Sequence, residues 1–298
     1  MDGVPSVAMS QQLGFAGMGT MGAPMAGHLL TAGYNVFVWN RTAAKAEPLR
    51  DKGGVPVATL EEMGAQCDVV FLCVNRTEDV KECLDALTKN AKPGTLFIDH
   101  STIAPDGAKA IAEDLRAKGF RFVDAPVTGG SVGAEKGQLT IFLGGAEPDV
   151  AEALDLVKPY AKRAERMGES GSGQWAKLAN QIAVGGALMA LCETLSFAHK
   201  AGLDLVQIRN MVAGGSGGSW AFENYGPKIL QKDWTPGFSV KNQRKDFGYC
   251  RAAAKTTDAA IPCTDLVDSL LAKLEEQGHA EWTTAALYEI LVEMGADA

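Results

Sequence analysis

Three closely spaced glycines constrain this chain more than any other feature: Gly17, Gly19 and Gly22. They follow an apolar run, Leu13–Ala16, and open a segment of helical character, Thr20–Thr31. G-x-G-x-x-G between a strand and a helix permits a tight turn, lets backbone approach a pyrophosphate and lets the helix pack on the strand. The N-terminus of the helix adds unpaired N–H groups and a positive dipole end. With a second strand following at Tyr34–Trp39, the pattern predicts a dinucleotide-binding unit.

The end of the second predicted strand favours one form of the dinucleotide. NAD-binding units place an acidic residue about 20 positions after the glycines, whereas this strand is followed by Asn40, Arg41 and Thr42. Arg41 can stack on adenine and hydrogen-bond a 2′-phosphate, and no carboxylate is present to repel that phosphate. The segment predicts NADP(H) as the cofactor. A solvated arginine at a strand end is the alternative.

Composition excludes several classes of function. The net charge of −8 argues against nucleic acid as the main partner, and the 46% apolar content of 298 residues indicates a globular chain with ample core. Its six cysteines form no C-x-x-C pair and no zinc spacing, which predicts free thiols, no metal, and a reducing, cytoplasmic compartment. Residues 1–11 do not resemble a secretory signal. The longest apolar stretch, Ile182–Cys192, is too short to span a bilayer, so we expect no membrane partner.

The chain changes character near residue 173. Before it, strand and helix candidates alternate, which predicts an α/β domain with a doubly wound parallel sheet of Rossmann type over residues 12–173. The predicted strands are Leu13–Ala16, Tyr34–Trp39, Asp68–Val74, Leu96–Asp99, Arg121–Val123 and Leu139–Leu143. After it, a long interdomain helix over Trp175–Ala201 leads into an all-α domain, residues 174–298, with helices near Val240–Thr256, Asp265–Gln277 and Trp282–Glu293. We expect the two domains to share a cleft at the start of the long helix.

Capping residues mark two helix starts: Thr59 with Glu62, and Asp204 with Gln207.

The loop after the fifth predicted strand carries a candidate substrate site. Thr128 supplies a hydroxyl, and Gly129 and Gly130 can present backbone N–H groups as a nest for a carboxylate. An ordinary glycine turn is the alternative.

Lys177 is the candidate proton donor. We expect Ser172 to cap the long helix, which places Lys177 in the early turns, where the positive helix end and desolvation favour a neutral amine that can exchange a proton with a substrate oxygen. Asn180 and Gln181 share its helix face. A solvent-facing lysine is the alternative, but its neighbours are apolar.

On a later helix, Lys245 can reach the cofactor or substrate, or pair with a neighbouring acid.

These segments together resemble the β-hydroxyacid dehydrogenase family, in its NADPH-using glyoxylate/succinic semialdehyde reductase branch. The resemblance covers nearly all of the chain after residue 11. Four motifs match in order and spacing: Gly14–Ala26, Asp124–Gly130, Gly171–Gln181 and Lys245–Asp246. Threonine stands at 128 where serine is usual in the family, glutamine stands at 181 where asparagine is frequent, and Asn75 replaces a usual proline.

The resemblance implies an oxidoreductase that interconverts a short carboxylate-bearing aldehyde and its hydroxyacid, with Lys177 as general acid/base and Asn180 or Gln181 orienting substrate. It implies cofactor contacts at Gly17, Met18, Gly19, Thr20, Met21, Asn40, Arg41, Thr42, Val74, Asn75, Thr102 and Lys245, and substrate contacts at Ser101, Thr128, Gly129, Gly130, Trp220 and Phe238. A catalytically silent NADP-binding sensor or scaffold, an imine-reductase-like enzyme and a phosphogluconate decarboxylase are the alternatives. Small residues of the long helix (Ala183, Gly185, Gly186, Ala187 and Ala190) predict close packing in a homo-oligomer, a dimer or tetramer.

Overall fold

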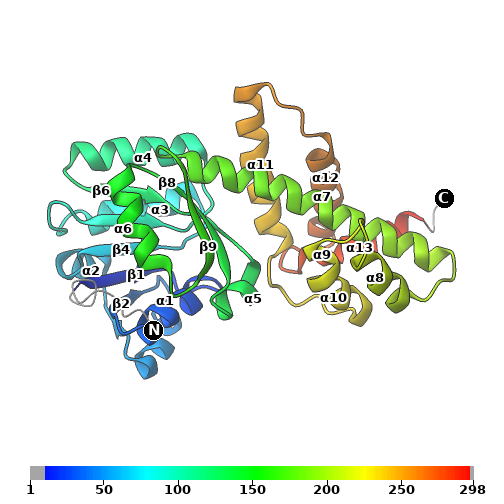
Figure 1. Cartoon of the computed structure of the whole chain (residues 1–298), viewed down its shortest axis with the longest axis horizontal. Coiled ribbons are helices and arrows are strands. Elements are labelled where there is room, and N and C mark those ends of the chain that lie inside the picture. Colours follow the sequence, from blue (N-terminus) through cyan, green and yellow to red (C-terminus); the bar gives the residue numbers. More distant parts are fainter. Residues whose placement is uncertain (1–10, 296–298) are drawn as a thin grey trace. The chain divides into compact units, whose positions relative to one another are not determined.

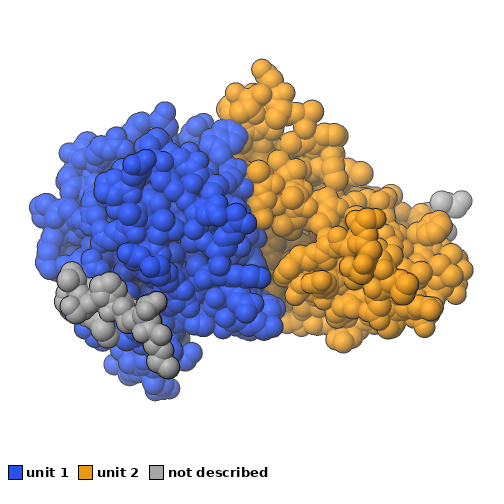
Figure 2. Space-filling view, in the orientation of Figure 1, with its two compact units in different colours: residues 1–177 blue, residues 178–298 orange. Residues whose placement is uncertain are grey.

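The chain was analysed as a computed structural model that describes residues 11–295. Nearly all of the N-terminal segment discussed above therefore lies outside the described residues. The chain divides into two compact units, residues 1–177 and 178–298 (Figure 2). One helix, α7 (Ser172–Lys200), contains the division. The sequence predicts this division four residues earlier, between residues 173 and 174.

The first unit is built on one mostly parallel sheet. Its strands are β1 (Gln12–Ala16), β2 (Asn35–Trp39), β3 (Val55–Pro56), β4 (Val69–Leu72), β5 (Leu96–Asp99), β6 (Arg121–Asp124), β7 (Val127–Thr128), β8 (Leu139–Gly144) and β9 (Ala161–Gly168). They lie in the order β3-β2-β1-β4-β5-β6-β8-β7, with β9 paired to β8. β1 to β6 run parallel, and β8 is antiparallel to both β6 and β7. The order reverses between β1 and β4, which is where ligands bind in such sheets.

Helices cover both faces of this sheet (Figure 1). They are α1 (Gly22–Thr31), α2 (Leu60–Gln66), α3 (Thr77–Leu87), α4 (Pro105–Ala117), α5 (Gly130–Glu135) and α6 (Glu147–Val157), with short 3₁₀ turns at Ala43–Lys45 and Glu47–Lys52. Successive residues of a strand point to opposite faces. Val69 and Phe71 of β4 accordingly join a core with α1 and α6, whereas Val70 and Leu72 join a core with α2, α3 and α4. The continuous apolar runs of the sequence are therefore strands buried on both sides.

The predicted Rossmann-type parallel sheet is confirmed, and the structure adds three strands that the sequence analysis did not predict. β3 and β7 have two residues each, too few for a periodic signal. β9 reads AKRAERMG and is largely exposed or half-buried, so it has no continuous apolar run. The Thr59 cap is present, since its side chain accepts a hydrogen bond from the Glu62 N–H.

Apart from an isolated bridge between Ser239 and Thr283, the described secondary structure of the second unit is helical. Besides most of α7 it contains α8 (Leu205–Ala213), α9 (Trp220–Asn224), α10 (Gly226–Gln231), α11 (Val240–Thr257), α12 (Pro262–Glu276), a 3₁₀ turn at Thr284–Ala286 and α13 (Leu287–Met294). Asp204 caps α8 through the Gln207 N–H, as expected. The short helices α9 and α10 follow a glycine-rich loop and were not predicted.

Helix α7 is long and apolar enough to cross a membrane when judged by length and composition alone. It is longer than the apolar run Ile182–Cys192, because small and polar residues extend the helix at both ends. The same test is passed by core helices of soluble proteins. In this chain α7 contributes Leu188, Leu191 and Leu195 to the core of the second unit.

The small residues of α7 serve different purposes. A side chain at Gly185 would lie 2.7 Å from the Phe247 ring of α11, so this glycine is required by packing within the unit. A side chain at Gly186 would meet only the Cys263 sulfur, at 4.0 Å. Ala183 and Ala190 are exposed on the helix surface. The homo-oligomer therefore stays a prediction, with Gly185 assigned to the interior.

This difference gives a matched test of packing. We expect Gly185→Ala to lower the free energy of unfolding by about 1–3 kcal/mol, because the added methyl overpacks a rigid ring. Gly186→Ala, one residue on, is expected to be neutral or to stabilise by up to about 1 kcal/mol, because alanine is the better helix former. Urea denaturation of both variants measures the two effects. Equal effects of the two substitutions would contradict the assignment.

Candidate functional site

The glycine turn after β1 is held by the end of β2. The Gly17 N–H donates to the Trp39 carbonyl at 2.8 Å, and the Met18 N–H donates to the Asn40 side-chain oxygen at 2.9 Å. The Asn40 amide nitrogen in turn donates to the Thr42 carbonyl at 3.0 Å. Asn40, predicted as a cofactor residue, thus also fixes the shape of the turn.

The three glycines are required for different reasons. Gly17 has φ +106°, and a side chain there would collide with the Cys73 carbonyl beside β4. A side chain at Gly22 would collide with the Gly17 carbonyl. At Gly19 a Cβ would meet no atom within 4 Å, so the protein's own packing does not demand glycine there. In nucleotide-binding turns, close approach of a pyrophosphate to the backbone favours glycine at this place. Helix α1 has no acidic residue in its first turn and no side-chain cap, as a phosphate site at its N-terminus would require.

Substitution of Gly19 is therefore expected to change cofactor binding without changing the stability of the fold. We expect Gly19→Ala to fold with an unchanged melting temperature and to bind a nicotinamide dinucleotide at least about tenfold more weakly, a loss of about 1.4 kcal/mol. Fluorescence titration with the reduced cofactor measures the affinity. Gly248→Ala on α11, where a Cβ also meets no atom within 4 Å, is the control. An unchanged affinity of Gly19→Ala would show that the pyrophosphate does not lie over this turn.

The residues after β2 present cations to solvent. Arg41 and Thr42 are exposed, Lys45 follows in a 3₁₀ turn, and positions 40–46 contain no carboxylate. Arg41 makes no ion pair with another residue in the range 11–295. Burial raises the pKa of Cys83 on α3 to about 12, and the nearby Arg41 guanidinium acts in the opposite direction. Arg41 thus lies on the α3 side of the switch point.

The loops after β4 and β5 are joined by Ser101. Its hydroxyl oxygen accepts from the Val74 N–H at 2.9 Å, and its own N–H donates to an Asp99 carboxylate oxygen at 2.9 Å. Ser101, predicted to contact substrate, is buried within this network. Asn75 is exposed and Thr102 half-buried beside it.

His100 has a structural role. Its Nδ1–H donates to the Ala125 carbonyl at 2.7 Å, and since that carbonyl can only accept, Nε2 accepts from the Tyr160 hydroxyl at 2.9 Å. The ring stacks on Phe71. Burial lowers the pKa of His100 to about 4, so the ring is neutral near pH 7 and both nitrogens are engaged. His100 cannot serve as the proton donor of a site at neutral pH.

The N-terminus of α7 is capped by Asp124 at the end of β6. One carboxylate oxygen accepts from the Gly171 N–H at 2.7 Å and the other from the Gln174 N–H at 3.0 Å. The expectation that Ser172 caps this helix is wrong, because Ser172 is already its first residue. The capping residue lies at the end of β6, far from the helix in the sequence, so no local pattern around residue 172 indicates it.

Asp124 is fully buried, and this burial raises its pKa from 3.8 to about 7 even though the two N–H groups act in the opposite direction. Between about pH 4 and pH 7 the folded protein therefore holds this proton more tightly than the unfolded chain. The contribution of Asp124 to the free energy of unfolding is lost as the pH rises through this window.

Asp124→Asn cannot ionise and keeps one acceptor. We expect the unfolding free energy of the wild type, minus that of Asp124→Asn, to shrink as the pH rises from about 4 to about 7. Urea titrations of both proteins across this range measure the difference. A difference that is independent of pH would contradict the raised pKa.

The predicted carboxylate turn follows directly from β7. Gly129 and Gly130 both have positive φ, +127° and +64°, and α5 begins at Gly130. The backbone therefore favours glycine at both positions, and binding of a carboxylate at this turn stays a prediction.

Lys177 lies in the second turn of α7 and is 6% exposed, so the alternative of a solvent-facing lysine does not hold. On the same helix, Asn180 donates to the Gln181 side-chain oxygen at 3.0 Å, and the Gln181 amide donates to Asp246 at 2.7 Å. Both ends of the Gln181 amide are thus engaged, whereas Asn180 is half-buried. Lys245 pairs with Asp246 at 3.1 Å, one of the alternatives that the sequence left open.

The remaining predicted substrate residues belong to the second unit. Trp220 begins α9 and is 46% exposed. Its ring packs edge-on against the Tyr225 ring, with 5.2 Å between the ring centroids. Phe238 is half-buried just before α11, and its carbonyl accepts from the Thr284 N–H. Their contacts with substrate stay a prediction. Sequence reasoning missed Gln174, whose side chain is fully buried and hydrogen-bonded, although it stands inside the Gly171–Gln181 motif.

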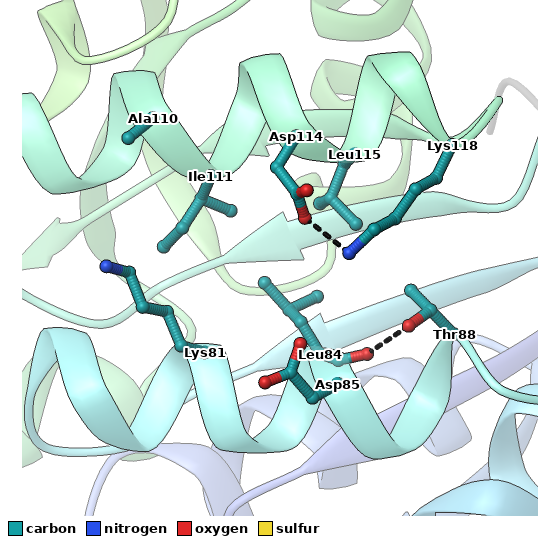
Figure 3. Close-up of a pocket in the computed structure, with 9 residues that line it drawn as sticks. All are labelled: Lys81, Leu84, Asp85, Thr88, Ala110, Ile111, Asp114, Leu115 and Lys118. Atoms are coloured by element: carbon teal, nitrogen blue, oxygen red, sulfur yellow. Dashed lines mark hydrogen bonds and ion pairs between the residues drawn. The ribbon is translucent and has the colours of Figure 1, made fainter.

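A groove between α3 and α4 contains none of the predicted site residues (Figure 3). Its lining is Lys81, Leu84, Asp85, Thr88, Ala110, Ile111, Asp114, Leu115 and Lys118. Lys118 pairs with Asp114 at 2.7 Å, and the Thr88 hydroxyl donates to the Leu84 carbonyl. Within the described residues no cluster of three or more His, Cys, Asp or Glu is placed to hold a metal, and all six cysteines are free thiols.

Two protein-family models together match almost the whole chain. A family model for the NAD binding domain of 6-phosphogluconate dehydrogenase matches residues 12–185. A second, described as NAD-binding of NADP-dependent 3-hydroxyisobutyrate dehydrogenase, matches residues 171–291.

Individual relatives align along almost the whole chain. The probable 3-hydroxyisobutyrate dehydrogenase-like 1, mitochondrial, of Arabidopsis thaliana is 38% identical over 93% of this chain and 84% of its own. The 2-hydroxy-3-oxopropionate reductase of Escherichia coli (strain K12) is 33% identical over 94% of this chain and 97% of its own. The solved Mycobacterium tuberculosis 3-hydroxyisobutyrate dehydrogenase with L-serine has a TM-score of 0.86 and 30% identity, covering 95% and 99% of the two chains.

Proposed function

The chain belongs to the β-hydroxyacid dehydrogenase family, and from this we propose that it is an NADP(H)-dependent reductase of short aldehydes that bear a carboxylate. At the coarser level it is an NAD(P)-dependent oxidoreductase of the hydroxyacid dehydrogenase type. One observation carries the proposal: the buried Lys177 lies on a helix whose N-terminus is fixed by Asp124, and Asp124 begins the segment that forms the Thr128–Gly130 turn.

The chemistry divides between cofactor and protein. A nicotinamide dinucleotide would be held at the Gly17–Gly22 turn and would supply the hydride for reduction of the aldehyde, or take it up in oxidation of the hydroxyacid. The Thr128–Gly130 turn holds the substrate carboxylate through a hydroxyl and backbone N–H groups. Lys177 gives its proton to the oxygen that becomes the hydroxyl, and takes it back in the reverse direction.

The two amides next to Lys177 have separate tasks in this proposal. Gln181 is bound at one end to Asp246 and at the other to Asn180, so it orients its neighbour. Asn180 is the half-buried member of the pair and is the one proposed to hydrogen-bond the substrate oxygen. Substrate names of relatives, 3-hydroxyisobutyrate and 2-hydroxy-3-oxopropionate, fit this class of small hydroxyacid or its aldehyde.

Removal of Lys177 tests the proton transfer. We expect Lys177→Ala, and the similarly sized Lys177→Met, to bind NADPH normally and to lose about 10²–10⁴-fold in kcat, the range of general acid catalysis. NADPH oxidation with glyoxylate, succinic semialdehyde, tartronate semialdehyde and methylmalonate semialdehyde measures turnover.

Lys200→Ala, an exposed lysine at the end of the same helix, is the control and is expected to retain full turnover. Near-normal kcat in Lys177→Ala would defeat the assignment of Lys177. A wild type that binds NADPH but reduces none of the aldehydes would favour the silent sensor or scaffold.

Arg41 tests the choice of cofactor. A charge-assisted hydrogen bond contributes about 1.5–3 kcal/mol, so we expect Arg41→Met to weaken NADPH binding by about 10–150-fold and NADH binding much less, because NADH loses only the stacking of Arg41 on adenine. Parallel titrations with both cofactors measure the selectivity. The exposed Arg116 on α4 provides the control substitution, Arg116→Met. An equal loss for both cofactors would overturn the assignment of Arg41 to the 2′-phosphate.

We also propose a reducing, cytoplasmic setting, with six free thiols as its support.

A further inference from the structure

Gln174 is fully buried in the first turn of α7, and every polar group of its side chain is used. Its side-chain oxygen accepts from the Ile103 N–H at 3.1 Å, and its amide nitrogen donates to the Ser101 carbonyl at 2.8 Å. Its backbone N–H donates to Asp124 at 3.0 Å. One residue therefore binds the helix to the loop after β5 and to the end of β6.

The loop that Gln174 grips is itself tied to other predicted site segments. Ser101 accepts from the Val74 N–H in the loop after β4 and donates to Asp99 at the end of β5. Asp124 leads into β7 and the Gly129–Gly130 turn. The strand-end loops and the start of α7 thus meet in one buried hydrogen-bond network, and Gln174 is its member on the helix.

Lys177 follows Gln174 by three residues, so the two side chains lie on neighbouring positions of one helix face. The first turn of a helix lacks intrahelical partners for its N–H groups and frays unless it is tied down. A small rotation of this turn would swing the long lysine side chain, and misplacement of a reacting group by about 1 Å can cost about 10²-fold in rate. The hydrogen bonds of Gln174 to Ser101, Ile103 and Asp124 prevent that rotation.

We propose that Gln174 is a positioning residue that sets the place of the Lys177 amine by clamping the first turn of α7 to the Ser101–Ile103 loop. The proposal rests on the proposed function for its effect on turnover. Its effect on the position of Lys177 is independent of any substrate.

The chain offers a matched control. Gln243 on α11 is as completely buried as Gln174, but neither of its amide atoms has a hydrogen-bond partner among the described residues. Methionine has nearly the same size as glutamine and makes neither hydrogen bond. We expect Gln174→Met to lower kcat about 10–100-fold with KM and the NADPH Kd within about threefold, and Gln243→Met to change none of them by more than about threefold.

A second variant distinguishes positioning from loss of stability. The protonated carboxyl of Gln174→Glu has one acceptor and one O–H donor, so it can make both bonds of the amide, whereas the ionised form would face the Ser101 carbonyl with a charge. We expect kcat of Gln174→Glu to approach the wild-type value at low pH and to fall as the pH rises, relative to the wild-type profile. A merely structural glutamine would not give this pH-dependent rescue in a protein that stays folded by circular dichroism.

Labelling of Lys177 with acetic anhydride, measured by peptide mass spectrometry as a function of pH, reports on the amine without any turnover. We expect the labelling profile of Lys177 to shift in Gln174→Met and to remain unchanged in Gln243→Met. An unchanged profile with kcat within about threefold of wild type would overturn the proposal. If Gln174→Met does not fold, the comparison of Gln174→Glu at low and high pH decides the question by the same measurement.

The two proposals fail in different ways. A shifted Lys177 profile in a protein that reduces no aldehyde would refute the reaction and retain the clamp. Loss of turnover in Lys177→Ala, with normal turnover and labelling in Gln174→Met, would refute the clamp and retain the reaction.

Discussion

The carboxylate of Asp124 against the first turn of α7 is the interaction on which the candidate site depends. Burying the charged form of this group is costly, and two backbone N–H groups and the positive end of a long helix offset only part of the cost, so the pKa of Asp124 stays raised at about 7. The packing around it is close: a side chain at Gly144 would lie 2.6 Å from the carboxylate, and one at Gly173 would lie 2.7 Å from the Asp124 carbonyl. Side chains at these two positions would therefore push the strand end and the helix start apart.

This junction converts sheet geometry into site geometry. Parallel strands bring their carboxyl ends to one edge, and the loops after β1, β4, β5 and β6 accordingly lie at the same edge of the first unit. Because Asp124 and Gln174 fasten α7 to two of these loops, the rigid sheet determines where the helix begins. The Tyr160 hydroxyl donates to His100, so this pair takes no part in the proposed proton transfer.

Much of this architecture could be predicted because its signals are local. Continuous apolar runs located β1, β4, β5 and β8, and the spacing of glycines located the nucleotide turn. Asp124 caps a helix that starts 48 residues later, and Gln181 binds Asp246, 65 residues away. Such pairs leave no periodic trace in one sequence, so Ser172 was a reasonable but wrong cap. The edge strand β9 lacks an apolar run because its residues are exposed or half-buried. Helices α9 and α10 contribute Phe222 and Ile229 to the core, but with five and six residues they are too short to show a helical period.

The continuity of α7 has a consequence for how such a chain can vary. An α-helix turns by about 100° per residue, so the addition or loss of one residue between Gln174 and Lys177 would rotate the lysine relative to the clamp. Surface loops accept changes of length because their ends absorb them. This stretch of helix cannot absorb such a change, so the number of residues between Gln174 and Lys177 matters for the candidate site as much as their identities do.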